Sequence, residues 1–300
     1  MSPRKTATKK LAKHPRHSVD SFRNEDANTV YIEYYKNVVI IMERGVDLES
    51  LENTFIPEVF KERTWTKLLN PSKGVYDNII KEFFANAFVE GDHLNCWVRG
   101  KNYTISRESI QELLEILPMT PNSFLRYDEE KDKPEPLVPI FRGQLKKKSL
   151  HTTDFSPEMG ALAYIMIFNH YPVKNLITLS QPRTIFLYDL FTHKEIDICG
   201  HIYHLLVKCV RRRKSRMTLS FPSLIISLIS KARVKLPSGL PVMSKEDPIS
   251  EHTINRSKAH IPSQEREVGA TQVQREEAET EGGNTEDEID QFTHGPEDIP

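Results

Sequence analysis

The sequence contains little cysteine, with three residues among 300, at Cys96, Cys199 and Cys209. An odd number with no paired spacing argues against a disulfide framework and favours a reducing compartment. Long apolar runs are also missing, since residues 161–168 and 224–229, the longest stretches, fall far short of the roughly 18–20 residues of a membrane span. No apolar run follows the basic N-terminus, so a secretory signal is not expected. We therefore expect a soluble protein of the nucleus or cytoplasm, with no membrane association.

Motifs for catalysis and phosphate binding are absent as well. Gly143 and Gly160 stand alone, so there is no glycine-rich phosphate loop, and the sequence shows neither a nucleophile elbow nor an HExxH metal motif. A metal-dependent strand-transfer enzyme needs several acids held together at the scissile phosphate. The core acids considered for this role are Asp77, Glu82, Asp154, Asp189 and Asp197. None sits in a recognisable motif, and the last two fall near predicted element ends, where surface acids are ordinary. The sequence predicts no enzyme activity, no cofactor and no bound metal.

One group of metal-binding residue types is a candidate zinc site, and its members are Cys199, His201, His204 and Cys209. Such a site requires four ligands that converge on a tetrahedron. The spacing C-x-H-x2-H-x4-C matches no common zinc knuckle or finger. On a helix, Cys209 falls on the apolar stripe, whereas His201 and His204 fall on the opposite face. We therefore expect buried cysteines and exposed histidines rather than a metal centre.

The formal net charge of −1 conceals a strong separation of charge along the chain. Residues 1–19 carry six Lys or Arg and no acid, while residues 241–300 carry fifteen acids against five bases. Neither end can bury enough apolar surface to offset its conformational entropy. We predict a disordered basic arm over residues 1–24 and a disordered acidic tail over residues 238–300. The core between them, residues 25–237, is expected to fold.

Apolar residues of this core mostly recur at the spacing of amphipathic helices. Helices are predicted over residues 32–42, 74–87, 107–117, 157–168, 196–212 and 221–229. Gly45 is expected to close the first helix, and Ser106 and Ser156 to cap the third and fourth, with Pro118 ending the third. The stretch 161–168 is apolar nearly all round, which predicts a central buried helix.

Strand signals are confined to one place. Two short runs of aromatic and β-branched residues, 94–99 and 103–105, flank a glycine turn and predict a β-hairpin. Residues 128–136, DEEKDKPEP, are charged and interrupted by proline, and we expect a loop there that divides the core into lobes over residues 25–127 and 137–237. The predicted fold class is mainly α: a multi-helix core in two lobes with one small β-hairpin, between a disordered basic N-terminal arm and an acidic C-terminal tail.

Two basic clusters are candidate sites for nucleic acid. Phosphate backbones attract such clusters through counterion release, and nuclear import factors recognise similar runs. The ordinary alternatives are a solubilising tail and a solvated helix face. The interleaved aromatics of a single-strand stacking platform are missing, so contacts would be to phosphates and without sequence specificity. The candidate residues are Arg4, Lys5, Lys9, Lys10, Lys13 and Arg16 in the arm, and Lys208, Arg211, Arg212, Arg213, Lys214 and Arg216 in the core. Both clusters favour the nucleus over the cytoplasm.

Several features in a fixed order resemble a known family. Trp65 precedes a helix led by Tyr76 that ends in Phe-Phe-Ala-Asn, and a hairpin with Val-Arg-Gly-Lys at 98–101 follows. A helix that begins Phe-Pro-Ser-Leu-Ile at 221–225 comes later. Over about residues 30–237 this order resembles the putative plant transposon protein domain, with Phe84 where that family has Tyr. The resemblance implies an origin in a plant mobile element. It implies no transposase activity, since the family has no established catalytic residues.

Together these features favour a non-catalytic protein derived from a plant transposable element. It would be a structural or nucleic-acid-associated component that contacts RNA or DNA through phosphates and associates with itself. The matching positions are mostly apolar, turn or cap residues, which indicates a role in the fold. Arg99 and Lys101 at the hairpin tip are the exception, where ligand contact competes with a favoured structural role. Two alternatives stay open: a transposase or inactive transposase remnant, and a domesticated protein-interaction module.

Overall fold

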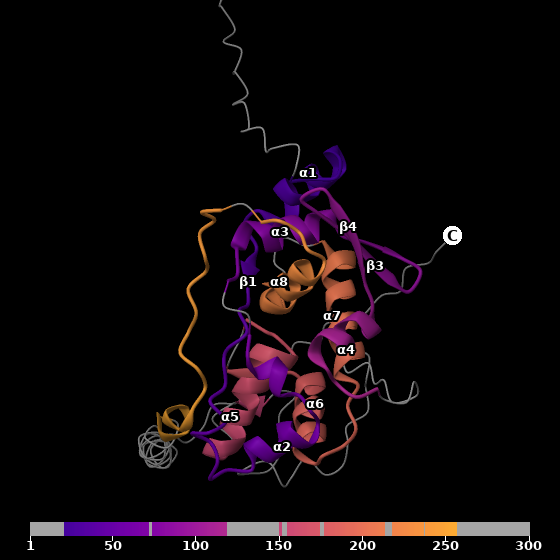
Figure 1. Ribbon diagram of the computed structural model, residues 1–300. Helices are drawn as coiled ribbons and strands as arrows, with labels where there is room; N and C mark the ends of the chain where they lie inside the picture. Colours follow the sequence, from indigo (N-terminus) through magenta and orange to yellow (C-terminus); the bar gives the residue numbers. More distant parts are fainter. Residues whose placement is uncertain are drawn as a thin grey trace, which may run out of the picture. The chain divides into compact units, whose positions relative to one another are not determined.

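Helices dominate the computed structural model of the chain (Figure 1). The described residues are 21–71, 74–118, 150–151, 155–174, 177–213, 218–236 and 238–256. Tertiary contacts group the chain into one unit up to Asn255 and a second from Arg256, and the elements below belong to the first. Within the described ranges, no helix has both the length and the apolar character needed to cross a bilayer. The prediction of a mainly α fold is confirmed at this level.

The first helical segment ends sooner than the sequence predicts. Asn24 caps α1 (Glu25–Val30), which continues as the π-helix η1 (Tyr31–Tyr35). The chain then enters the strand β1 (Val39–Ile40), which pairs in parallel with β7 (Thr218–Leu219). The prediction of a helix through Met42 is therefore wrong. The β-branched side chains of β1 suit a strand, and the strand that provides its hydrogen bonds lies far away in the sequence.

The helix α3 (Asp77–Asn86) lies deep in the core and confirms the helix predicted over residues 74–87, with a start three residues later. Every residue from Ile79 to Asn86 is buried, which explains the wide apolar face. The helix packs against η1, α7 (Ile198–Arg212) and α8 (Pro222–Lys231). Two short helices precede it, α2 (Ile56–Glu62) and the 3-10 helix η2 (Thr66–Leu69).

The predicted hairpin is confirmed and belongs to a small antiparallel sheet. Its strands are β3 (His93–Val98) and β4 (Lys101–Ile105), with Leu94 opposite Ile105. Gly100 adopts a left-handed φ of 82° in the turn, as a two-residue hairpin loop requires. A third strand, β2 (Phe88–Glu90), pairs with β3 and was missing from the prediction. The inward positions of β3 are buried and the sheet packs on α3.

Ser106 caps α4 (Arg107–Leu114) as predicted. Its hydroxyl accepts a hydrogen bond from the Ser109 amide, and the Ser109 hydroxyl accepts one from the Ser106 amide, which completes a capping box. The helix ends at Glu115, which takes a left-handed conformation, rather than at Pro118. A left-handed residue directly after the last helical turn is a common way for helices to end.

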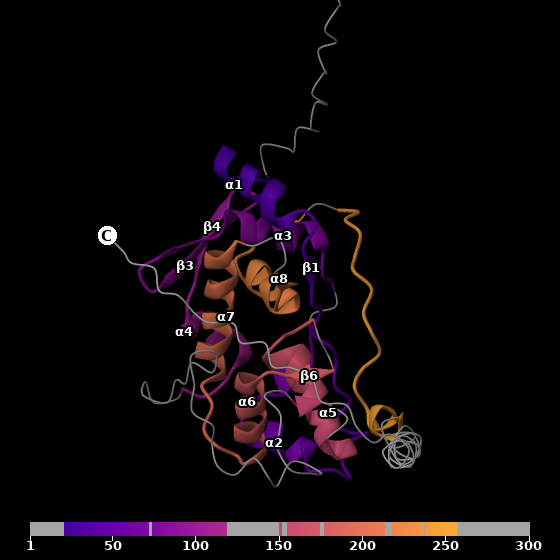
Figure 2. The same cartoon turned by 180° about the vertical axis from the view of Figure 1, so that it is seen from behind.

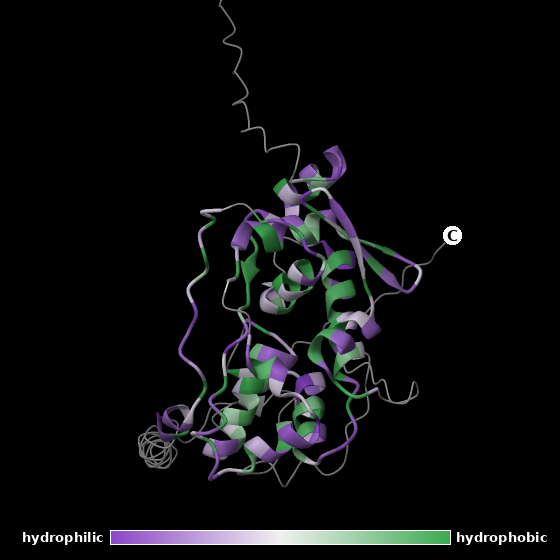
Figure 3. Cartoon of the chain, viewed as in Figure 1, coloured by the Kyte–Doolittle hydropathy of each residue, from purple (hydrophilic) through white to green (hydrophobic). Residues whose placement is uncertain are grey.

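The C-terminal half is also helical. Ser156 caps α5 as predicted, and α5 with its π-helical continuation is buried nearly all round, which confirms the central helix. The elements of this C-terminal half are β5 (Leu150–His151), α5 (Pro157–Ile165), η6 (Met166–His170), β6 (Thr178–Leu179) and α6 (Gln181–Phe191), followed by α7, β7 and α8. In both views α8 lies between α7 and β1, next to α3 (Figures 1 and 2). These neighbouring elements carry mostly apolar residues (Figure 3).

Elements from before and after the loop 128–136 pack together, since β1 pairs with β7 and α4 contacts α7 and α8. That loop lies outside the described residues, and the division into lobes over 25–127 and 137–237 stays a prediction.

At each end of the chain, part of the stretch predicted to be disordered packs on the core. Ser21 and Phe22 are buried, and Phe22 lies against Tyr31. At the other end, Ile249 and Ile254 are buried although the disordered tail was predicted to start at 238. The predictions of disorder for 21–24 and for 238–256 are therefore wrong, because isolated apolar side chains in these polar stretches are buried against the core. Residues 1–20 and 257–300 lie outside the described residues, so their disorder stays a prediction.

Candidate nucleic-acid interface

The helix α7 builds the basic surface that the sequence indicates. The Asp197 carboxylate accepts a hydrogen bond from the Gly200 amide and so caps the helix. The apolar stripe that includes Ile202, Leu206 and Val210 is buried, which turns the opposite face outward. At the end of that face, Arg211, Arg212 and Arg213 are exposed and Lys208 is half-buried. We call these four residues the α7 basic end.

Part of the predicted interface lies outside the described residues. This applies to Lys214 and Arg216, which follow the α7 basic end directly in the sequence. It also applies to the arm residues Arg4, Lys5, Lys9, Lys10, Lys13 and Arg16. Their role in binding stays a prediction.

Contacts on the core side fix the last turns of α7. The Tyr35 hydroxyl of η1 donates a hydrogen bond to the Cys209 carbonyl at 3.3 Å. Burial raises the pKa of Tyr35 above its ordinary value of 10.0, so this hydroxyl stays a donor well above neutral pH. The Cys209 thiol lies 3.8 Å from the Thr218 carbonyl of β7. These contacts hold the α7 basic end in one place on the core.

His201 does not belong to the exposed basic face. Its side chain is buried, with ring centroids 4.6 Å from Tyr171 and 5.0 Å from Phe186. The prediction of an exposed His201 is wrong, because the first turns of α7 are covered by α6 and the segment before it. The polar face therefore becomes accessible only further along the helix.

The candidate zinc ligands on α7 do not form a site. Burial raises the pKa of Cys199 to about 12 and that of Cys209 to about 11, so both thiols keep their protons at neutral pH. Across the part of the chain that the structure describes, no group of three or more His, Cys, Asp or Glu side chains could hold a metal ion. All three cysteines are free, as expected.

Two acids expected at the surface are buried ion-pair partners. The Asp197 carboxylate lies 2.9 Å from the Arg107 guanidinium, and the Asp189 carboxylate lies 3.0 Å from the Lys194 ammonium. Both acids are about 5% exposed, so the prediction of ordinary surface acids is wrong. A buried carboxylate needs a cation or several donors, and each of these has its own cation.

The hairpin tip has a structural role, as the sequence favoured. Arg99 binds the buried Glu82 carboxylate with two hydrogen bonds, of 2.9 and 2.8 Å. The Lys101 ammonium donates to the Arg233 carbonyl at 2.6 Å, just beyond α8. Both cations are therefore engaged by the core, although the turn itself is at the surface.

One buried acid, Glu43, was not recognised from the sequence. Its two carboxylate oxygens accept hydrogen bonds from the Ser223 and Leu224 amides, at 3.0 and 3.1 Å. The α8 N-cap residue is Phe221, which offers no side-chain acceptor, so Glu43 caps this helix from a distant part of the chain. The sequence does contain a signal for this cap. Glu43 is a lone acid directly after the apolar run 38–42, and the start of α8 lacks a capping side chain.

Glu43 also lines a cavity of about 330 Å³ beside α8. Burial raises the pKa of its carboxyl group, while the amides at the start of α8 oppose that rise. The other lining residues are Thr66, Lys67, Leu68, Asn70, Pro71, Leu113, Leu114, Asn169, Phe221, Ser223, Leu224 and Ser227. Since capping of α8 accounts for Glu43, we assign the residue a structural role.

Comparison with known proteins places this architecture in a family. A family model described as Putative plant retrotransposon-related domain matches residues 61–235, more than half of the chain. The match begins in the last turn of α2 and ends just after α8, so it includes the three-stranded sheet and the α7 basic end. No curated protein and no solved structure matches the chain. The chain therefore belongs to the Putative plant retrotransposon-related domain family and is a plant mobile-element protein, as the order of its motifs indicates.

Proposed function

We propose that the protein is a non-catalytic component of a plant mobile element that associates with nucleic acid in the nucleus. The single observation that carries this proposal is the α7 basic end, where exposed cations lie at the end of a helix that is bonded to η1 and β7 and falls within the family-matched region. Lys208, Arg211, Arg212 and Arg213 would contact phosphates of RNA or DNA.

A structural explanation accounts for only part of this cluster. Cations near a helix C-terminus stabilise it through the helix dipole, and Arg211 and Arg212 lie in that last turn. The dipole effect falls off within one turn, yet the basic run continues through Lys214 and Arg216 in the sequence. A run of this length exceeds what capping requires and suits phosphate binding through counterion release.

The engagement of four of the five acids considered from the sequence supports a non-catalytic role, while the fifth, Asp154, lies outside the described residues. Asp77, Glu82, Asp189 and Asp197 each have a different cation as partner, namely Lys81, Arg99, Lys194 and Arg107. A metal-dependent transposase needs carboxylates that share a metal ion. Dispersed acids that are already neutralised fit a binding protein better than a transposase or its remnant.

The test is charge reversal of the α7 basic end in the full chain. The variant Arg211→Glu/Arg212→Glu is compared with Lys61→Glu/Lys174→Glu, which changes the net charge equally at exposed positions elsewhere. Affinity for random RNA and duplex DNA is measured across a salt series. If both arginines contact phosphates of duplex DNA, the slope of log K against log salt becomes shallower by about 1.8 in the test variant only.

Other outcomes decide against the proposal. Equal losses in both variants mean that binding follows net charge and has no site at α7. Nicking or joining of DNA with magnesium or manganese supports the transposase alternative. A defined protein partner without any salt-sensitive binding to nucleic acid supports the domesticated interaction module.

A further inference from the structure

The cavity beside α8 has the size and the lining of a small-molecule site. Its volume of about 330 Å³ falls within the range that such sites occupy. Exposed residues in and just after η2, among them Thr66 and Asn70, belong to its lining, so the cavity opens to solvent. Its apolar walls come from η2, α4 and α8, and they consist of Leu68, Leu113, Leu114, Phe221 and Leu224. An apolar recess of this size can take up a small organic molecule.

Contacts between the elements hold these walls in position. The Lys67 ammonium forms an ion pair with the Glu115 carboxylate at 2.6 Å, which joins η2 to the end of α4. The Lys231 ammonium forms another with the Glu112 carboxylate at 2.8 Å, which joins α8 to α4. The helices α4 and α8 also pack against each other. The cavity is therefore part of the folded chain and needs no ligand to form.

The polar part of the lining is buried and fixed. Glu43 is 6% exposed, Ser223 is 2% exposed and Asn169 is 1% exposed. The Asn169 side chain accepts a hydrogen bond from the Arg44 amide and donates one to the Arg44 carbonyl, both at 2.9 Å. The Glu43 carboxylate is held by the α8 amides that it caps. A ligand in the cavity therefore meets a carboxylate whose position is set by the fold.

Glu43 differs from the other buried acids in having no cation as its partner. Glu82, Asp189 and Asp197 each form an ion pair with a basic side chain. Among the described residues, none forms such a pair with Glu43. The start of α8 gives Glu43 hydrogen bonds, but a helix N-terminus carries only about half an elementary charge. Capping therefore explains the position of this carboxylate and leaves it without a full countercharge.

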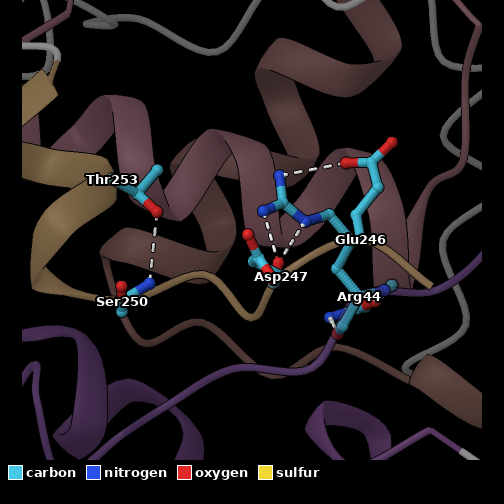
Figure 4. Close-up of polar contacts among 6 residues, drawn as sticks. Arg44, Glu246, Asp247, Ser250 and Thr253 are labelled. Atoms are coloured by element: carbon cyan, nitrogen blue, oxygen red, sulfur yellow. Dashed lines mark hydrogen bonds and ion pairs between the residues drawn. The ribbon is translucent and has the colours of Figure 1, made fainter.

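The cation next to Glu43 in the chain and the one in the cavity lining are both engaged elsewhere. The Arg44 guanidinium donates to the Asp247 carbonyl and forms an ion pair with Glu246 at 3.4 Å (Figure 4). Lys67 of the lining is used in its ion pair with the end of α4. Burial raises the pKa of the Glu43 carboxyl group, and a cation in the cavity would oppose that rise. The cavity therefore favours a ligand that carries positive charge.

We propose that this cavity binds a small organic cation, whose ammonium group lies at the Glu43 carboxylate and whose apolar body packs between the leucines of η2, α4 and α8. A hydrogen bond between an ammonium group and a carboxylate is charge-assisted and about twice as strong as one between neutral groups. The carboxylate thus selects cations over neutral molecules of the same shape and rejects anions. The site shares no residue with the α7 basic end, so it does not rest on the proposed function.

Three probes of nearly the same shape test this selection by charge. Benzylamine, benzyl alcohol and benzoate carry a cationic, a neutral and an anionic group on the same ring. Their dissociation constants for the full chain are measured by saturation-transfer NMR at neutral pH. We expect benzylamine to bind about tenfold more tightly than benzyl alcohol, as one charge-assisted hydrogen bond provides. Benzoate should bind more weakly than either.

Two matched variants on α8 separate the cavity from the rest of the surface. Ser227 lines the cavity, and its hydroxyl donates to the Ser223 carbonyl. Ser230 is exposed outside the lining, and its hydroxyl donates in the same way to the Ile226 carbonyl. Ser227→Phe fills the cavity and should abolish the binding of benzylamine, whereas Ser230→Phe should leave it unchanged. Urea denaturation shows whether each variant is folded.

Glu43→Gln tests the carboxylate itself, since it keeps an acceptor for α8 and removes the charge. We expect this variant to bind benzylamine and benzyl alcohol with equal affinity, a result that does not depend on Ser227→Phe. Failure of the wild type to bind benzylamine at millimolar concentration overturns the proposal, and so does equal affinity of the wild type for benzylamine and benzyl alcohol. A Glu43→Gln chain that still prefers benzylamine, or a folded Ser227→Phe chain that binds it as the wild type does, places the amine elsewhere and also overturns the site.

Discussion

At the scale of single residues, buried polar groups explain why particular side chains occur where they do. Glu43 follows an apolar run and would look misplaced without its partners, the two amides that begin α8. Phe221, at the N-cap position, has a left-handed φ of 60° and no capping side chain, and Pro222 has no amide to donate. The start of α8 therefore depends on an acceptor from elsewhere in the chain.

Removal of that acceptor should destabilise the fold. Glu43→Ala leaves two buried amides without a partner, and we expect the free energy of unfolding to fall by about 2–4 kcal/mol. Glu43→Gln keeps one acceptor oxygen and should lose less. Urea denaturation of both variants measures the difference. A Glu43→Ala protein as stable as the wild type would show that α8 does not need the Glu43 carboxylate as its N-terminal cap.

His170 makes stability depend on pH. It is fully buried and stacks on Phe60 at a centroid distance of 5.4 Å, and burial lowers its pKa from 6.5 to about 3. In the unfolded chain the ring takes up a proton near pH 6.5, whereas the folded chain keeps it neutral. Its contribution to stability is therefore fully present above about pH 6.5 and is lost as the pH falls toward about 3.

The variant His170→Phe tests this dependence, since it keeps an aromatic ring in the stack and removes the titration. Between pH 7 and pH 4 we expect the denaturation midpoint of the wild type to fall more than that of the variant. Equal falls in both proteins would mean that His170 is protonated in the folded state.

At the scale of elements, one ion pair connects the three-stranded sheet to α3. The Arg99 side chain at the hairpin tip and Glu82 of α3 are both largely buried, and burial raises the pKa of Glu82 while Arg99 opposes that rise. Arg99→Ala would leave a buried carboxylate without its cation, and we expect a loss of about 3–5 kcal/mol in the free energy of unfolding.

A second variant distinguishes the ion pair from simple packing. The double variant Glu82→Gln/Arg99→Leu removes both charges, so thermal denaturation should show it to be more stable than Arg99→Ala. If the double variant is the less stable of the two, the ion pair is not what holds the hairpin to α3.

Elements with local signals could be predicted from the sequence, and those formed by distant partners could not. The caps at Ser106 and Ser156 and the hairpin depend on neighbouring residues, and all three are present. The strand β1 was mistaken for helix because its partner β7 lies far along the chain. The docking of residues 238–255 on the core was missed because two isoleucines, Ile249 and Ile254, in a polar stretch give no periodic pattern.

The candidate interface follows the same rule. The spacing of α7 places Arg211 and Arg212 on its polar face, and both are exposed in the structure, whereas their role in binding stays a prediction. The burial of His201 depends on which segments cover the first turns of that helix, which spacing cannot reveal. The same limit applies to the two buried acids. The cation of Asp189 is Lys194, which lies beyond the end of α6, and the cation of Asp197 is Arg107 of α4.

At the scale of the whole molecule, a chain of a plant mobile-element family carries an exposed basic cluster, the α7 basic end, for which a nucleic-acid role is proposed. Binding of the full chain to random RNA and duplex DNA across a salt series tests the central claim most directly, with a chain that lacks residues 1–19 measured in parallel. The account predicts binding by the full chain that weakens steeply with salt. It also predicts weaker binding without the arm, with the part due to α7 retained. Absence of binding by either chain at low salt would contradict the account and remove nucleic acid from the function of this protein.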